Sequence, residues 1–505
     1  MALSSLHIRL RTLTPLWTGG VDGTMDRIHE TGILGSLRWW YEAIVRGLGE
    51  EACDPTEHTC ELSGERLKRY ESARAQGKDW WDALNEADIC DACKVFGTTG
   101  WRRRFRVEVV SREGGIDPTE GMFPSGRVHP DRRRDYRVGG WLLRGGYLGN
   151  LELRFTGEER LLLCEILPTL LFVEKWGALG PKTSIGYGVF EIIEVRVGER
   201  IFSRDSADWL SQLQESIQLM CRGSRLGAWW WQQELPENLQ PYQGILPALT
   251  NMFFAKIRLQ ANDSNWWRSF REIRWLQSGF IPLGEALWTG EANHRNPRRY
   301  SISNAFPVRL ISHWANNHGV FPLAPIVRTC LRYGHRNGSN CTSVCQNGES
   351  NWCKFIFGTV KGQQHICGYC GERVREDRFT SNNKWCPEAR ISLSQSEVIK
   401  EGKRIQSKIR VSWAYRLQEN EWEFRLWGWL PEDGRNNNRH HQQRTEFLEN
   451  IRDFPWQDIV VQAQLRCWFA KQRDENTVDF LKALLTHCDT EPTEGSASTG
   501  GGRAR

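Results

Sequence analysis

The chain has 505 residues, a formal net charge of +6 and 39% hydrophobic residues. That length exceeds what one ordinary core needs and predicts two or three domains. No stretch approaches the run of about 18 apolar residues that spans a bilayer, so no transmembrane helix is expected. At the start of the chain Leu6, Ile8 and Leu10 alternate with polar residues, which favours a strand over a signal peptide and hence a cytoplasmic protein.

The beginning of the chain predicts a strand followed by a helix. The strand runs from Leu6 to about Thr14 and ends at Pro15. After a glycine-containing loop, Thr31 can cap a helix over about 32–46, where apolar residues recur at spacings of three and four. A strand and helix in this order open a split β-α-β unit.

Cysteine spacing predicts a first metal site. The chain has 15 cysteines, and a cytoplasmic compartment keeps thiols reduced, so disulfides are not expected. Cys53 and Cys60, followed by Cys90 and Cys93, form a set of four thiols within 41 residues. Four thiolates suit a structural zinc ion that ties an insertion to the fold. The alternative is that they are unliganded core cysteines, and His58 is a possible substitute ligand.

A second cysteine cluster predicts another zinc ion, with ligands that the spacing leaves open. Its candidates are Cys341, Cys345, Cys353, Cys367, Cys370 and Cys386. Cys367 and Cys370 flank a Gly-Tyr pair and precede a glycine, as in a zinc knuckle. Cys341, Cys345 and Cys353 could instead join His335. We expect about two structural zinc ions, because closed four-ligand sites are structural.

A short repeat divides the chain into halves. CKVFGTTG at 93–100 returns approximately as CKFIFGTVKG at 353–362, each after a cysteine-bearing insertion, which favours duplication. In the second half, strands are expected at 253–259, 409–415, 422–426 and 463–469, with a helix at about 444–452. The expected units are an N-terminal domain at 1–200 with a zinc insertion at about 50–95, a helical connector at 201–250, a C-terminal domain at 251–488 with a zinc insertion at about 330–390, and a disordered tail at 489–505.

Two segments suggest contact with nucleic acid. Residues 101–144 hold 11 arginines against 6 acids, and the arginine fork suits phosphate; the alternative is a solvated basic face. A glycine-rich loop at 177–188 precedes a strand at 189–197. This loop is no Walker motif, which needs a strand before it. Its glycines let one backbone pass close to another, and Lys182, Thr183 and Ser184 can donate to phosphate.

Three motifs carry a family resemblance, namely TPLWTGG at 14–20, GILGSLRWWY at 32–41 and FGTTGW at 96–101. They resemble signatures of the first RAMP subunit of the Cmr (type III-B) CRISPR effector complex, and the loop at 177–188 is similar to the one that defines RAMP proteins generally. The resemblance implies an α+β fold of two ferredoxin-like (RRM-like) RAMP domains in tandem, with cysteine-rich zinc-binding insertions. It also implies contact with the 3′ part of guide RNA, with target RNA and with other Cmr subunits, no small-molecule substrate, and no cutting of target RNA.

We expect one basic, glycine-lined RNA path. The residues assigned to it are Arg27, His29, Arg38, Arg102, Arg103, Arg104, Gly180, Lys182, Thr183 and Ser184, with Trp17, Trp39 or Trp101 available to stack on a base. Arg38 is expected to reach outward, and the alternative is that it pairs with Glu42. A competing function is a metal-independent endoribonuclease that matures guide RNA, with His29 and Lys182 as a crude catalytic pair. A zinc-bearing scaffold without RNA contact is the third possibility.

Overall fold

The computed structural model describes residues 3–20, 23–54, 60–130, 136–221, 223–261, 266, 308–333, 335–337, 340–342, 344, 350–358, 365–376, 384–386, 390–394, 397–399, 406–435, 438–460 and 462–485. Among these residues, no helix is both long enough and apolar enough to cross a membrane. The tail expected at 489–505 lies outside them.

The first half forms an antiparallel sheet with the strand order β2-β5-β1-β6-β7. Its strands are β1 (Leu3–Thr12), β2 (Phe105–Ile116), β5 (Tyr147–Glu158), β6 (Phe190–Val197) and β7 (Arg200–Ser203). Helix α1 (Glu30–Gly47) follows β1, and α6 (Leu167–Trp176) joins β5 to β6. The expected strand and helix are both present, but α1 begins before Thr31 and its N-cap is His29.

The second half forms another antiparallel sheet, with the order β20-β8-β19-β18-β9. Its strands are β8 (Met252–Gln260), β9 (Val320–Phe321), β18 (Ala414–Gln418), β19 (Glu421–Trp429) and β20 (Ala463–Ala470), with β17 (Ile409–Val411) also paired to β19. The single strand expected at 409–415 is therefore two strands. They separate where the Trp413 amide leaves the sheet and donates to the Gly186 carbonyl, 3.0 Å away.

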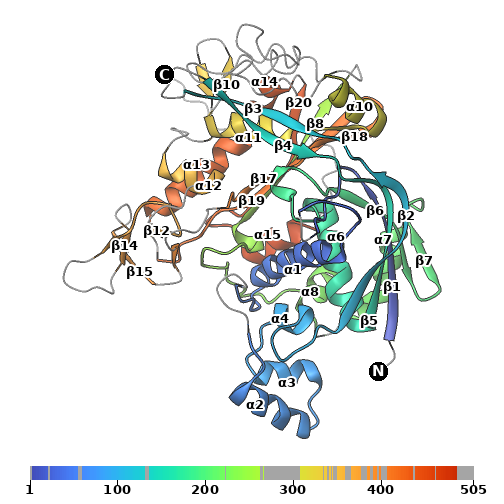
Figure 1. Ribbon diagram of the computed structural model, residues 1–505. Helices are drawn as coiled ribbons and strands as arrows, with labels where there is room; N and C mark the ends of the chain where they lie inside the picture. Colours follow the sequence, from blue (N-terminus) through green and yellow to red (C-terminus); the bar gives the residue numbers. More distant parts are fainter. Residues whose placement is uncertain are drawn as a thin grey trace, which may run out of the picture.

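The helices of the first half pack against the second sheet, so both halves share one core (Figure 1). Trp40 of α1 lies 6.4 Å from Trp427 of β19, measured between ring centroids. Trp176 of α6 lies 5.5 Å from Phe254 of β8 and 5.1 Å from Phe469 of β20. Burial of such large aromatic surfaces joins the two sheets tightly.

The remaining elements lie outside the two large sheets. Between α1 and β2 lie α2 (Gly64–Ala75), α3 (Trp80–Glu86) and α4 (Asp91–Phe96), and β3 (Glu120–Pro130) pairs with β4 (Tyr136–Arg144). The others are α5 (Glu159–Leu161), α7 (Trp209–Ile217), α8 (Arg225–Gly227), α10 (Val308–His318), α11 (Ala324–Tyr333), β10 (His335–Asn337), β11 (Asn340–Thr342), α12 (Asn351–Phe357), β12 (Ile366–Cys367), β13 (Arg375–Glu376), β14 (Lys384–Cys386), β15 (Ile391–Leu393), β16 (Val398–Ile399), α13 (Asn438–Arg452), α14 (Trp456–Ile459) and α15 (Thr477–Ala483).

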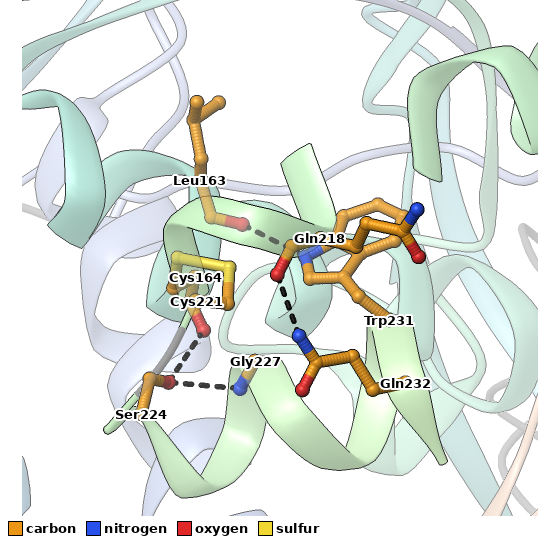
Figure 2. The surroundings of a disulfide bond; sticks show 8 residues. All are labelled: Leu163, Cys164, Gln218, Cys221, Ser224, Gly227, Trp231 and Gln232. Atoms are coloured by element: carbon orange, nitrogen blue, oxygen red, sulfur yellow. Dashed lines mark hydrogen bonds between the residues drawn. A yellow bond between two sulfur atoms is a disulfide. The ribbon is translucent and has the colours of Figure 1, made fainter. Parts of the chain in front are cut away.

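A disulfide between Cys164 and Cys221 ties the connector to the helix before β6 (Figure 2). The expectation that no cysteine forms a disulfide is therefore wrong for this pair. The helix contains a π-helical turn at Leu162–Ile166, just before Pro168. Because proline has no N–H, it cannot donate to the Cys164 carbonyl one turn earlier, and the Ser224 hydroxyl donates to that carbonyl instead, at 3.3 Å.

Candidate RNA groove and metal centres

The first insertion brings four cysteine sulfurs together. Cys53, Cys60, Cys90 and Cys93 place their sulfurs within 4.8 Å of one another, so the predicted convergence is confirmed. Two backbone amides point at sulfurs: that of Cys53 lies 3.4 Å from Cys90 Sγ, and that of Cys90 lies 3.5 Å from Cys60 Sγ. Amide donors favour the thiolate form, so the set fits a tetrahedral metal ion. His58 lies outside the described residues.

Arg38 faces this cysteine group and does not reach outward as expected. Its guanidinium donates to Glu42 at 2.8 Å, to the Gly97 carbonyl at 3.3 Å and to Cys93 Sγ at 3.5 Å. Burial raises the pKa of Glu42, and the hydrogen bond from Arg38 opposes that rise. The structure therefore has the alternative arrangement, in which Arg38 pairs with Glu42 and contacts Cys93 Sγ.

The second group contains three cysteines and a histidine. Cys367, Cys370, Cys386 and His440 place their ligand atoms within 4.8 Å of one another, and all four residues are buried. The other ring nitrogen of His440, Nδ1, lies 3.0 Å from an Asp433 carboxylate oxygen. A carboxylate behind a histidine fixes its tautomer and orients it toward a metal. The sequence pattern did not identify His440, because it lies on α13, 54 residues after Cys386.

Among the described residues, the predicted ligand Cys353 is not in this group. Cys353 is fully buried on α12, and its sulfur lies 3.8 Å from the Arg332 carbonyl. Cys345 and the side chains of His335 and Cys341 are outside the described part of the chain. The expected arrangement of Cys353 with these three residues therefore stays a prediction.

A groove of about 1210 Å³ lies between the first insertion and the edge strand β2. Helices α2, α3 and α4 supply one wall, and β2 and β5 supply the other. Its lining comprises Tyr70, Arg74, Trp80, Phe96, Gly97, Thr98, Trp101, Arg102, Arg103, Arg104, Phe105, Arg106, Thr156 and Glu158. The groove therefore combines five arginines with five aromatic side chains and one acid.

Two indoles of the groove stack on each other, and an arginine lies beside both rings. The rings of Trp80 and Trp101 are 5.8 Å apart and inclined by 25°. The Arg104 guanidinium lies 5.4 Å from the first ring and 5.5 Å from the second. All three consecutive arginines, 102–104, are exposed. Unpaired nucleotides stack their bases on indoles, and exposed guanidinium groups bind their phosphates.

The glycine-rich loop joins the two halves. Gly186 has a φ of +101°, and a Cβ there would lie 2.4 Å from Trp413 Cδ1, so only glycine fits. The Trp413 indole also donates to the Ile185 carbonyl at 3.0 Å. The expected close approach of two backbones is therefore present, and it is made to the second sheet. The Gly180 amide donates to the Ser36 hydroxyl of α1 at 2.9 Å.

The remaining predicted RNA residues gather around Trp17 and Thr18. Lys182 Nζ lies 3.3 Å above the Trp17 ring, and Thr183 and Ser184 are half-buried in a short 3₁₀ turn. The His29 amide donates to the Thr18 hydroxyl at 2.8 Å, while its ring contacts Asp26 at 2.7 Å. Arg27 pairs with Glu30 at 3.8 Å. The predicted residues thus form no single path: the three arginines at 102–104 line the groove, Arg38 faces the first cysteine group, and the others lie near the start of α1 or in the glycine-rich loop.

Residues 9–191 match the family model of the RAMP superfamily. A chain in the cryo-EM structure of the type III-B Cmr-beta complex bound to cognate target RNA is 11% identical, with 89% of this chain and 100% of that chain covered and a TM-score of 0.31. Cmr1 from Pyrococcus furiosus in its apo form is 13% identical, with 54% and 72% covered and a TM-score of 0.25. Csc2 from Thermofilum pendens is 13% identical, with 45% and 81% covered and a TM-score of 0.21. The search of curated proteins gave no match.

Proposed function

We propose that the chain is a non-catalytic RNA-binding subunit of a type III-B (Cmr) CRISPR effector complex, since residues 9–191 match the family model of the RAMP superfamily. In this role it contacts the 3′ part of guide RNA and the target RNA, next to other Cmr subunits. The RAMP match and the three motifs at 14–20, 32–41 and 96–101 support the assignment. The observation that carries it is the groove of stacked indoles and exposed arginines beside β2.

The same proposal includes two ferredoxin-like domains in tandem. Both sheets are antiparallel, and four strands in each follow one order: β6-β1-β5-β2 in the first and β20-β8-β19-β18 in the second. Numbered along the chain within each half, both orders are 4-1-3-2. A split β-α-β unit followed by a second one produces this order.

The proposal also includes two structural zinc ions, of which the first stabilises the insertion that lines the groove. The ligand sets are Cys53, Cys60, Cys90 and Cys93 in the first insertion and Cys367, Cys370, Cys386 and His440 in the second. With four protein ligands each, both sites are closed and structural. The first set anchors the insertion that carries Trp80, since Cys93 lies on α4 directly before the turn that leads to Trp101.

Binding of a single-stranded RNA across a salt series tests the function. Trp101→Ala should weaken binding by about 5-fold to 150-fold, since a stacked base contributes about 1–3 kcal/mol. Arg104→Ala should lower the log–log salt slope by about 0.7 if the guanidinium contacts one phosphate. Arg200→Ala is the matched control, because this exposed arginine lies on β7 at the opposite edge of the same sheet. Equal effects of Arg104→Ala and Arg200→Ala would contradict the groove.

The same RNA distinguishes binding from cleavage. His29 is held by Asp26, and Lys182 lies over Trp17, so the two side chains of the alternative endoribonuclease have partners of their own. We expect the RNA to remain intact during incubation with the protein in the absence of metal. Cleavage that is lost in His29→Ala and Lys182→Ala would favour the endoribonuclease.

A further inference from the structure

A third group of possible metal ligands lies at the junction of the two halves. Asp117 follows β2, while His313 and His318 lie on α10, and the ligand atoms of the three residues are within 4.8 Å of one another. Unlike the cysteine groups, this one has only nitrogen and oxygen donors. Two imidazoles and one carboxylate make up a set of ligands that binds divalent transition metals and leaves coordination positions open.

Neighbouring groups hold the carboxylate in place. The Thr119 amide donates to Asp117 Oδ1 at 2.9 Å, and the indole of buried Trp314 donates to Oδ2. The Asp117 backbone is fixed as well, because its amide donates to the Gly146 carbonyl at 3.0 Å. Hydrogen bonds of this kind pre-orient a ligand and raise metal affinity.

The histidines come from the end of one helix. Their ring centroids are 5.1 Å apart, and Gly319, with a φ of +62°, ends the helix directly after His318. Asn317 Nδ2 lies 2.8 Å from His313 Nδ1. A 180° rotation of this carboxamide would instead place its oxygen against Nδ1–H and leave the Nε2 lone pair for a metal.

The group lies next to the joint made by the glycine-rich loop. Trp314 is 4.9 Å from Trp413, measured between ring centroids, and Trp413 is 5.0 Å from Tyr187. A metal ion held by Asp117 and α10 would therefore link the two halves directly beside the contact of Gly186 with Trp413.

We propose that Asp117, His313 and His318 bind one divalent transition-metal ion that clamps α10 to the end of β2. The ion keeps open positions, since the protein supplies three ligands. It is distinct from the two cysteine-rich centres, with which it shares no residue.

Cobalt(II) added to the full-length, zinc-loaded protein tests the proposal. Calorimetry should show one further equivalent bound, and the visible absorption should be that of nitrogen and oxygen ligands, without a thiolate-to-cobalt charge-transfer band. Binding should also slow hydrogen exchange of the α10 amides, because the clamp opposes local opening. Asp117→Asn, His313→Ala and His318→Ala should each weaken binding by more than the roughly 10-fold to 100-fold that loss of an outer partner costs.

Two matched variants control for the histidines and for the helix. Asn316→Ala alters an exposed residue of α10, and His441→Ala removes a histidine on α13; neither should change cobalt affinity. Trp314→Phe should weaken binding by about 10-fold to 100-fold, because Asp117 loses an orienting donor. Absence of the further equivalent, a thiolate band, or an affinity that the three ligand variants leave unchanged would overturn the proposal.

Discussion

Replacing Arg38 with methionine distinguishes a structural role in the ion pair with Glu42 from contact with an RNA phosphate. The structure gives Arg38 a charge partner in Glu42, whose side chain is only 4% exposed, and contacts with Gly97 and Cys93. Breaking a buried ion pair costs about 3–5 kcal/mol. The Arg38 side chain is 21% exposed and Arg46 stays 3.7 Å from Glu42, so we expect a loss of about 2–3 kcal/mol.

Hydrogen exchange of the α4 amides measures this loss where it should occur. The double variant Arg38→Met, Glu42→Gln should recover part of the stability, because no unpaired carboxylate is left and buried Arg46 still donates to three backbone carbonyls. The log–log salt slope of RNA binding should stay unchanged in Arg38→Met. A slope lowered by about 0.7, with α4 exchange unaltered, would refute the structural role and restore the expected phosphate contact.

Three further changes have defined outcomes. Burial raises the pKa of Glu165 to about 7 from 4.5, so the unfolded state loses this proton at a lower pH than the folded state. The free energy of unfolding should therefore fall by about 3 kcal/mol as the pH rises from 4.5 to 7. Thermal unfolding measured across this pH range should lose this dependence in Glu165→Gln. Cys60→Ser and His440→Ala should each reduce the zinc content of the purified protein from two ions to about one, and equal metal content in all three proteins would contradict the assigned ligands. Gly186→Ala should lower the melting temperature and expose the joint to proteolysis, because its Cβ would lie 2.4 Å from Trp413; an unchanged melting temperature would show that the loop can move away.

Local patterns predicted much of the fold. Alternation located β1, β8, β19 and β20, and three-four spacing located α1, because each pattern depends only on neighbouring residues. The spacing of Cys90 and Cys93 likewise predicted a metal group, since both residues lie at the start of one short helix.

The missing features depend on residues far apart in the chain. His440 reaches its cysteines from 54 residues away, and the disulfide joins residues that are 57 apart. The helical spacing also could not predict that the Arg38 side chain is enclosed. Its helix is covered on one side by the sheet and on another by the first insertion, so a position outside the apolar stripe is still enclosed.

The two copies of the sequence repeat form the same local structure. Both copies make a short helix, α4 and α12, that ends at a glycine of positive φ, +88° at Gly97 and +82° at Gly358. In each half an arginine from an earlier helix donates to a carbonyl at this turn: Arg38 to Gly97 at 3.3 Å, and Arg328 to Phe357 at 3.0 Å.

The two copies differ at the cysteine that precedes the helix. Cys90 stands at the N-cap position of α4 without a capping hydrogen bond and belongs to the four-cysteine group, whereas the Ser350 hydroxyl caps α12 by accepting from the Cys353 amide at 3.1 Å. A serine hydroxyl serves as a helix cap but is a poor substitute for a thiolate ligand. The turn and its arginine are thus common to both halves, while a metal ligand at this cap belongs to the first half, where α4 also forms a wall of the groove.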